Sequence, residues 1–515
     1  MTLSQWFIFF IIVQLVHFIG TWKLYVSAGR KSWEAAIPVY NAIVLLKIIG
    51  RPTWWTVLLF LPIINLIIFP VIWVETLSCF GKNTTKDKVL AVATFGLYIA
   101  YVNYTQKLNY VADRSNEPVN KTADTISSLL FAIVVATFVH TYFIQPFTIP
   151  TSSLEKSLLV GDFLFVSKVN YGARTPMTTV ALPMVHDTIP LTKKKSYLTW
   201  PELPYFRLPG FQNIERNDIV VFNWPIDTVY KFRDQSGLRV DKPIDKKSNY
   251  VKRCVGVPGD QLEIKDGIIF VNGKELILPE RARPQFSYKI ALDGKTPIDF
   301  EYLLNDMDIT DGAGFMDAEK RGTLFIAALT ATNAERLQHI PGITGVQKII
   351  SKEVEQGIFP HINKWNRDNF GPIYIPQQGK TVPLNLETLP FYKAIITDYE
   401  KNILQVTGSE IRINGKIATS YTFQQNYYWM MGDNRHNSED SRYWGYVPEN
   451  HVVGKPTFIW MSYDSSGKGL KKIRWDRLFT TVSGEGQPQS YFKFFLFALV
   501  AYFIGEYFWK KKKSV

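Results

Sequence analysis

The chain has 515 residues, too many for one ordinary compact domain, so two or more units are expected. Its net charge of +13 could indicate a nucleic-acid partner, but there is no basic stripe interleaved with aromatic residues. Positive clusters flank apolar segments instead, and tryptophans gather at the ends of those segments. This pattern is typical of membrane proteins, so we expect a lipid bilayer as a partner and no nucleic acid.

Apolar segments in the first 125 residues predict a membrane region with about three spans. The first runs from Trp6 to about Gly20 and lacks the basic start and small-residue cleavage site of a removable signal. Trp54–Val74 is a second span, and Val89–Tyr101 is a shorter and weaker third. Ala35–Ile49 is also apolar but contains Pro38, so we expect it to lie at the interface or to pack on other helices.

Two further apolar segments flank the middle of the chain. Ile126–Ile144 is the clearest span, and Phe494–Trp509 is followed directly by the four lysines 510–513. By the positive-inside rule these lysines stay in the cytoplasm, which leaves Gln145 to about Gln489 on the exported side. If Val89–Tyr101 does not span, the orientation of the chain start reverses, but the middle stays exported.

The exported region is predicted to be mostly β-structure. Gly161–Lys168, Asp218–Phe222 and Tyr250–Val255 are rich in β-branched and aromatic residues, as strands are. Asn272-Gly273 and Asn414-Gly415 each lie between alternating apolar residues, which is the strongest short-range signal for a β-hairpin.

Two polar stretches interrupt the predicted strands. Gly172–Glu215 is rich in Pro and Thr and is expected to be a long loop. Pro279 to about Gln405 is too long for one loop and carries helical patterns at Ala331–Leu337 and Val346–Val354, so we expect an inserted α+β lobe. The predicted domains are a membrane region (1–125), an anchor (126–146), two parts of a β domain (147–278 and 406–489), the lobe (279–405), and a last helix with its tail (490–515).

A serine-rich corner follows the clearest span, in the segment Pro150–Asp162. Ser153 is a candidate nucleophile there, because a serine hydroxyl becomes reactive when a neighbouring base takes its proton. The alternative is structural, since Ser152-Ser153-Leu154-Glu155 contains the Ser-x-x-Glu pattern of a helix capping box. For this stretch alone, the cap is the better interpretation.

Lys252 is the candidate base. A lysine with the usual pKa of about 10.4 is protonated at neutral pH and cannot accept a proton. An apolar setting lowers that pKa, and one is offered here by Val251, Val255 and Val257. The adjacent Arg253 could act in the same direction, although along a strand it points to the opposite face. The alternative is an ordinary solvated lysine on a strand.

A third stretch runs from Met431 to Gly445. Its Gly432-Asp433-Asn434-Arg435 segment could be only a turn after a Tyr427–Met431 strand. Further polar residues follow at spacings that could bring a hydroxyl and an ion pair together, namely Ser438, Asp440 and Arg442. None of these residues is diagnostic alone. Their order and joint occurrence behind a membrane span are the informative features.

Together the three stretches resemble the conserved boxes of the type I signal peptidases, the membrane-bound Ser-Lys proteases that remove secretory signal sequences. The pattern Gly-Asp-Asn-Arg-x-Asn-Ser-x-Asp-Ser-Arg is highly specific to that family and is present without a gap from Gly432 to Arg442. The resemblance covers the last span before the serine and Pro150 to about Pro456, apart from the two insertions. It implies helical transmembrane spans plus a mainly β exported catalytic domain with a signal-peptidase-like β fold, here carrying the inserted α+β lobe.

The resemblance also implies roles for individual residues. Ser153 matches the nucleophile and Lys252 the general base. Thr151 matches the position whose hydroxyl helps to form the oxyanion hole beside the Ser153 N–H, and Ser438 matches the serine that orients the lysine. The ion-pairing residues that support the site are matched by Arg253, Asp433, Asp440 and Arg442.

The implied function is that of signal peptidase I, a serine endopeptidase that removes N-terminal signal peptides from exported preproteins through an acyl-enzyme. The implied location is a bacterial cytoplasmic (inner) membrane, crossed several times, with the catalytic domain on the exported, extracytoplasmic side. The partners are then preproteins with signal peptides and the bilayer, and the secretion translocon is a further candidate.

Two alternatives remain at this point. Lys156 stands where Pro is common in the first box and creates Ser153-x-x-Lys156, the signature of penicillin-binding proteins and β-lactamases. Those enzymes also need Lys-Thr-Gly, which this chain lacks, and Ser-Asp-Asn, where it has Gly432-Asp433-Asn434. The second alternative is a catalytically inactive, membrane-anchored binding or scaffold protein, against which the intact Ser153, Lys252 and Ser438 argue.

No metal or cofactor is expected. The seven histidines are scattered, without His-Glu-x-x-His, Cys-x-x-Cys or a phosphate-binding glycine loop. The two cysteines, Cys79 and Cys254, do not make a disulfide framework. His436 lies inside the third box and is expected to be a solvated or hydrogen-bonded turn residue.

Overall fold

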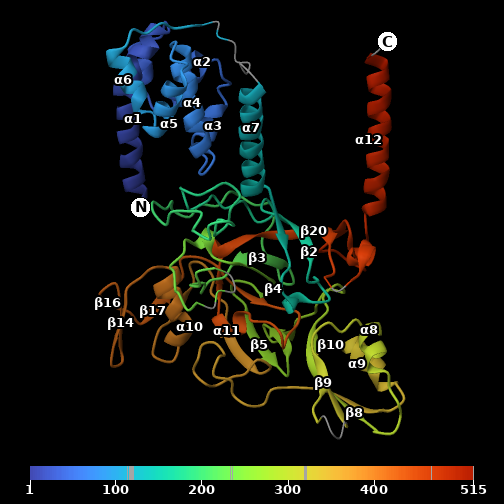
Figure 1. Ribbon diagram of the computed structural model, residues 1–515. Helices are drawn as coiled ribbons and strands as arrows, with labels where there is room; N and C mark the ends of the chain where they lie inside the picture. The colour runs from blue at the N-terminus through green and yellow to red at the C-terminus, as the bar shows by residue number, and fades with distance from the viewer. Residues whose placement is uncertain are drawn as a thin grey trace. The chain divides into compact units, whose positions relative to one another are not determined.

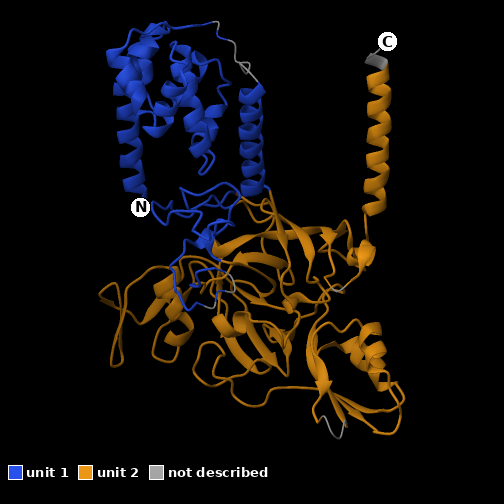
Figure 2. Cartoon of the chain, viewed as in Figure 1, with its two compact units in different colours: residues 1–143, 174–208, 228–247 blue, residues 144–173, 209–227, 248–515 orange. Residues whose placement is uncertain are grey.

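The computed structural model describes residues 1–112, 114, 121–231, 234, 236–317, 322–465 and 467–513. The gaps touch five predicted segments, because the residues outside the description are 113 and 115–120 of the membrane region, 232, 233 and 235 of the first part of the β domain, 318–321 of the lobe, 466 of the second part of the β domain, and 514–515 of the tail. The chain forms two compact units (Figure 2). The first consists of residues 1–143, 174–208 and 228–247, and the second of residues 144–173, 209–227 and 248–515.

The first unit is helical. Its helices are α1 (Leu3–Ser27), α2 (Tyr40–Ile48), α3 (Trp55–Leu58), α4 (Asn65–Cys79), α5 (Thr85–Ala93), α6 (Leu97–Thr105) and α7 (Lys121–Tyr142). Several of them bury one apolar cluster that includes Leu24, Leu46, Ile68 and Val102. Within the predicted loop Gly172–Glu215, the chain makes isolated β-bridges and no named helix or strand over its described residues.

Over the described residues, three helices are long and apolar enough to cross a membrane, namely α1, α7 and, in the second unit, α12 (Phe492–Lys513). They contain the segments predicted at Trp6–Gly20, at Phe494–Trp509 and, up to Tyr142, at Ile126–Ile144. The apolar helices thus agree with insertion into a membrane.

The two other predicted spans are not single helices, which corrects the sequence interpretation. Trp54–Val74 is divided between α3 and α4, and α4 has 15 residues, where a span needs about 20. Val89–Tyr101 is divided between α5 and α6 at Gly96, which has a φ of +82° that interrupts the helix. Before Lys121, α1 alone among the described residues has the length and composition of a span. Hydropathy could not reveal these breaks, because the residues around them are apolar too.

The second unit is mainly β, which confirms the predicted fold class. Its largest sheet is eight-stranded and antiparallel, with the order β1-β2-β20-β3-β4-β18-β19 and with β21 beside β20. The strands are β1 (Ile144–Thr148), β2 (Asp162–Ser167), β3 (Ile219–Asn223), β4 (Asn249–Gly256), β18 (Tyr427–Met431), β19 (Val447–Pro448), β20 (Val452–Ser462) and β21 (Thr480–Thr481). The strands predicted at Gly161–Lys168, Asp218–Phe222 and Tyr250–Val255 are therefore β2, β3 and β4.

Smaller sheets pack beside the large one. One has the order β12-β5-β6-β7, a second has the order β14-β15-β16, and a third pairs β13 with β17. Both predicted hairpin turns are confirmed, since Asn272-Gly273 joins β6 to β7 and Asn414-Gly415 joins β15 to β16, all four residues with positive φ. The strands are β5 (Gln261–Lys265), β6 (Ile268–Val271), β7 (Lys274–Glu275), β12 (Phe370–Tyr374), β13 (Thr381–Pro383), β14 (Leu404–Thr407), β15 (Glu410–Ile413), β16 (Lys416–Ile417) and β17 (Ser420–Thr422).

The inserted lobe is an α+β structure with a core of its own, as predicted (Figure 1). Its sheet has the order β11-β8-β10-β9. The elements are β8 (Gln285–Leu292), α8 (Phe300–Asp306), β9 (Ala313–Phe315), β10 (Thr323–Thr330), α9 (Ala331–Gln338) and β11 (Ile343–Lys348).

The lobe is shorter than predicted. Residues after Lys348 return to the main β domain, where β12 pairs with β5 and Phe370 is buried in the same apolar cluster as Trp429. The expected helix at Val346–Val354 is wrong, because this segment contains the end of β11, which is paired with β8. Cross-strand pairing of β-branched residues outweighed a weak helical pattern there. The other predicted domain boundaries stay predictions.

The fold predicts a strong effect of a methyl group at Gly161, which joins the first box to β2. Gly161 has a φ of +89°, and a Cβ there would lie 1.9 Å from the carbonyl oxygen of Tyr463. We expect Gly161→Ala to lower the free energy of unfolding by about 3 kcal/mol or more, measured by denaturation in detergent. Gly273→Ala is the matched control: it has a φ of +79° but open space around it, so about 1 kcal/mol is expected. Equal losses in the two variants would contradict this assignment.

Candidate active site

The first box forms a tight turn between β1 and β2. Ser153 lies in the 3-10 helix η2 (Ser152–Leu154) and is 8% exposed. The next residue, Leu154, is fully buried in one apolar cluster with Leu158 and with Leu164 of β2. This packing holds the turn against the sheet. The predicted capping box is not formed, because the N-cap residue Thr151 makes no side-chain cap and the Glu155 carboxylate accepts the Val160 N–H at 3.4 Å.

Lys252 reaches this turn from β4, between β3 and β18 in the sheet. Its Nζ lies 2.5 Å from the Oγ of Ser153, and the residue is only 3% exposed. Burial lowers the pKa of Lys252 to about 8, against the opposing effect of the Asp440 and Glu439 carboxylates. About one tenth of the lysine is then neutral at pH 7, so the pair has the geometry and the protonation state for transfer of the serine proton.

The neighbouring Arg253 points to the other face of β4 and pairs with Asp433. The guanidinium is bidentate, with Nε 2.8 Å from Oδ1 and Nη2 2.6 Å from Oδ2. Burial alone would raise the pKa of Asp433, but the Arg253 charge holds it below its usual value. The same carboxylate accepts the Ser157 hydroxyl at 2.6 Å. This buried pair therefore connects the second and third boxes with the first.

A second buried ion pair closes the third box on itself. Both contacts between the Arg442 guanidinium and the Asp440 carboxylate are 2.9 Å long. Asp440 also accepts the Gly432 N–H at 3.0 Å, and Arg442 donates to the Arg435 carbonyl at 2.6 Å. Because both charges are fully buried and hydrogen-bonded, they hold the loop that precedes α11 (Ser441–Trp444) in one conformation.

Gly432 allows the third box to approach the serine closely. A Cβ at this position would lie 2.2 Å from the Oγ of Ser438 and 2.5 Å from the carbonyl oxygen of Ser153. The next contact is made by Asn434, whose N–H donates to that carbonyl at 3.1 Å. Only glycine fits at this position, because any Cβ would collide with these groups.

Ser438 and Thr151 lie near Ser153, but among the described residues neither makes a hydrogen bond that would show its predicted role. Ser438 is 7% exposed, and within the described part of the chain its Oγ has no hydrogen-bond partner. The predicted hydrogen bond to Lys252 is thus not made here. Thr151 is exposed and lies two residues before Ser153. The roles of both residues stay predictions.

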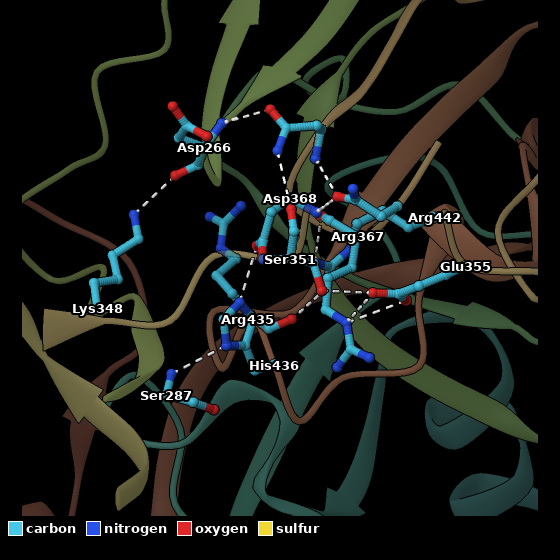
Figure 3. A network of polar contacts seen from close by, with 12 residues as sticks. Asp266, Ser287, Lys348, Ser351, Glu355, Arg367, Asp368, Arg435, His436 and Arg442 are labelled. Atoms are coloured by element: carbon cyan, nitrogen blue, oxygen red, sulfur yellow. Dashed lines mark hydrogen bonds and ion pairs between the residues drawn. The ribbon is translucent and has the colours of Figure 1, made fainter. Parts of the chain in front are cut away.

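The side chain of His436 is only 7% exposed and is hydrogen-bonded, the second of the two states expected for this residue (Figure 3). Its Nδ1 accepts the N–H of Ser287 on β8 at 3.1 Å, and its Nε2 lies 2.9 Å from Oδ1 of Asp368. Asp368 also accepts the Ser351 N–H at 2.8 Å. The third box is therefore tied to the lobe and to the segment that follows it.

The lobe contributes contacts that the sequence interpretation missed. Strand β8 bridges to the third box, where the N–H of Gln285 donates to the Asp433 carbonyl and the N–H of Arg435 donates to the Gln285 carbonyl. On the other side, Lys156 Nζ lies 2.5 Å from Oδ2 of Asp308. This ion pair directs Lys156 to the lobe, which argues against the Ser-x-x-Lys alternative. Only the long-range fold brings these residues together, so no local pattern could have revealed them.

Metal ligands are not clustered in the described ranges. No group of three or more His, Cys, Asp or Glu side chains there could hold a metal ion.

Comparison with known families identifies the chain. The family model described as "Signal peptidase, peptidase S26" matches residues 122–322 and 375–461, more than half of the chain. The chain belongs to this family. The predicted resemblance is therefore confirmed, and the protein is a serine endopeptidase. A second model, of a family of unknown function (DUF5684), matches residues 33–113 in the first unit.

Curated relatives agree with this assignment. Signal peptidase I of Buchnera aphidicola subsp. Schizaphis graminum is 24% identical over 350 residues, which are 66% of this chain and 75% of that protein. Signal peptidase I of Haemophilus influenzae is 23% identical over 377 residues, 71% of this chain and 77% of that protein. Signal peptidase I of Rickettsia typhi is 29% identical over 165 residues, 32% of this chain and 49% of that protein.

The pKa of Lys252 predicts the pH dependence of this peptidase. Only neutral Lys252 accepts a proton, so kcat/KM should rise with pH through a midpoint near 8 and then level off. Glu439→Gln removes a carboxylate that raises the pKa of Lys252, and the midpoint should therefore move to lower pH. The exposed Glu353 offers a control, and Glu353→Gln should leave the midpoint unchanged. An unchanged midpoint in Glu439→Gln would count against this electrostatic account.

Proposed function

We propose that the protein is a signal peptidase I that removes N-terminal signal peptides from exported preproteins, with Ser153 as nucleophile and Lys252 as general base. The observation that carries the proposal is the buried 2.5 Å contact between Lys252 Nζ and Ser153 Oγ. Membership of the peptidase S26 family and the similarity to signal peptidase I of Buchnera aphidicola and Haemophilus influenzae support the same activity.

The reaction follows from this pair. Neutral Lys252 takes the proton of Ser153 while Oγ attacks the scissile carbonyl carbon and forms a C–O bond. The tetrahedral intermediate then collapses, the C–N bond breaks, and the Lys252 ammonium gives its proton to the leaving amine. The product at this stage is an acyl ester on Ser153 with neutral Lys252. Water attacks that ester with Lys252 again as base, the C–O bond to Ser153 breaks, and the Lys252 ammonium returns a proton to Oγ. The signal peptide leaves as a carboxylic acid that ionises in water, and both Ser153 and neutral Lys252 are restored.

The developing oxyanion needs donors near Ser153. We assign this role to the main-chain N–H of Ser153 and the hydroxyl of Thr151. The conformation of η2 supports the assignment, because the Ser152 carbonyl is held by the Glu155 N–H at 2.9 Å and by the side chain of Asn434 at 3.2 Å.

Ser438 is assigned the role of positioning the Lys252 side chain by a hydrogen bond. Its buried hydroxyl lacks a partner among the described residues, and an unsatisfied buried hydroxyl is costly. Once Ser153 is acylated, Lys252 needs a new hydrogen-bond acceptor, and the Ser438 Oγ is proposed to provide it. The ion pairs of Arg253 with Asp433 and of Arg442 with Asp440 are proposed to keep these groups in place.

The protein is proposed to cross the cytoplasmic membrane several times. The lysines that end α12 favour a cytoplasmic C-terminus, so the catalytic domain between α7 and α12 lies on the exported side. With α1 as a span, Arg30 and Lys31 after it favour the cytoplasm, which places the N-terminus of α1 outside. Preproteins and the bilayer are the proposed partners, and the secretion translocon is a further one because preproteins emerge from it.

The test is cleavage of a secretory precursor in detergent by the parent protein, Lys252→Ala and Lys156→Ala. Loss of the general base should lower kcat by about 10²–10⁴-fold in Lys252→Ala. Lys156→Ala breaks a partly exposed ion pair with Asp308 and should stay within about fivefold of the parent. An inactive parent would contradict the proposed function. A normal Lys252→Ala beside an inactive Lys156→Ala would contradict the dyad.

A further inference from the structure

One loop of the inserted lobe touches the catalytic turn. It joins α8 to β9 and contains Asp311, whose Oδ2 accepts two amide hydrogen bonds from the third box. The donors are Nδ2 of Asn434 at 2.5 Å and Nδ2 of Asn437 at 3.1 Å. The same loop carries Asp308, which pairs with Lys156 on the other side of the turn. The lobe therefore contacts the nucleophile segment through Asp308 and the third box through Asp311.

Both asparagines also bind Ser152, the residue before the nucleophile. Nδ2 of Asn434 donates to the Ser152 carbonyl oxygen at 3.2 Å, and Nδ2 of Asn437 donates to the Ser152 Oγ at 3.0 Å. Each amide NH₂ group thus has one hydrogen on Ser152 and the other on Asp311. One carboxylate oxygen in the lobe completes both of these bridges.

The carboxylate fixes which way the amides point. An ionised carboxylate can only accept hydrogen bonds, so a rotated amide would place its oxygen against the negative charge. For Asn434 this preference is strong, because the residue is fully buried and its NH₂ group faces two acceptors, the Ser152 carbonyl oxygen and Asp311 Oδ2. Asp311 therefore holds the NH₂ group of Asn434 towards the Ser152 carbonyl.

The Ser152 carbonyl belongs to the same peptide group as the N–H of Ser153. A trans peptide is planar and its C=O and N–H point in opposite directions, so holding the oxygen also aims the N–H. That N–H is the proposed donor to the oxyanion, whose stabilisation is very sensitive to donor position.

We propose that Asp311 is a positioning residue of this peptidase, which orients the Ser153 N–H through Asn434 and Asn437. The inference rests on the proposed function and extends it, because it makes the inserted lobe part of the catalytic apparatus. The sequence around Asp311, between a helix and a strand of the lobe, carries no catalytic motif.

The test compares steady-state cleavage of a secretory precursor by the parent and by Asp311 variants. Asp311→Ala should lower kcat about tenfold or more and change KM less than about threefold, since the donor acts on the transition state. Asp311→Asn keeps an acceptor oxygen and should recover kcat to within about threefold of the parent. The pH midpoint should stay that of the parent in both variants, because Lys252 is not affected.

Two further variants separate positioning from a general effect on the lobe. Asp306→Ala removes an exposed lobe carboxylate that pairs with Arg336, and it should cleave like the parent. In an Asn434→Ala background, Asp311→Ala should lower kcat by less than about a further threefold. The reason is that the contact from Asp311 through Asn434 to the Ser152 carbonyl is already broken. Parent-like kcat in Asp311→Ala, an equal loss in Asp306→Ala, or a full additional loss in the Asn434→Ala background would each overturn the inference.

The proposed function is checked in the same assay. Ser153→Ala should be inactive while the parent cleaves. If Ser153→Ala cleaves like the parent, the proposed function fails and the inference fails with it. If Ser153→Ala is inactive and Asp311→Ala is parent-like, the inference fails alone.

Discussion

The burial of Lys252 against Ser153 is the constraint on which the site depends. A lysine in water keeps its proton, so the chain must remove this one from solvent and give it a single direction. A strand in the middle of an antiparallel sheet does both, because β3 and β18 cover the two edges of β4. The turn that carries Ser153 then covers the end of the side chain.

Buried charges around the lysine could defeat this arrangement. Asp440 and Asp433 are fully buried near Lys252, and both raise its pKa. Each carboxylate has its own arginine, however, and Arg442 partly offsets the effect of Asp440 on the lysine. The two ion pairs thus have a second effect besides holding the loops in place. The arginines neutralise carboxylates that would otherwise stabilise the protonated form of Lys252.

The candidate site could be predicted from the sequence because its three boxes together resemble those of a known family, although none of their residues is diagnostic alone. Strand alternation separates Lys252 from Arg253. The β-hairpins at Asn272-Gly273 and Asn414-Gly415 were predictable from a local pattern, since their turn geometry needs those residues. The breaks in the membrane helices could not be predicted, because helix continuity among apolar residues depends on packing. The contacts of Asp308, Asp311 and Asp368 depend on long-range folding and have no local signature.

The most direct test of the account is to identify the residue that carries the acyl group. The protein would be mixed with a precursor peptide, quenched in acid within the first turnover, digested and mapped by mass spectrometry. The account predicts an added acyl mass on Ser153, and none there in Lys252→Ala over the same time. An acyl group on any other residue, or full acylation of Ser153 without Lys252, would contradict it.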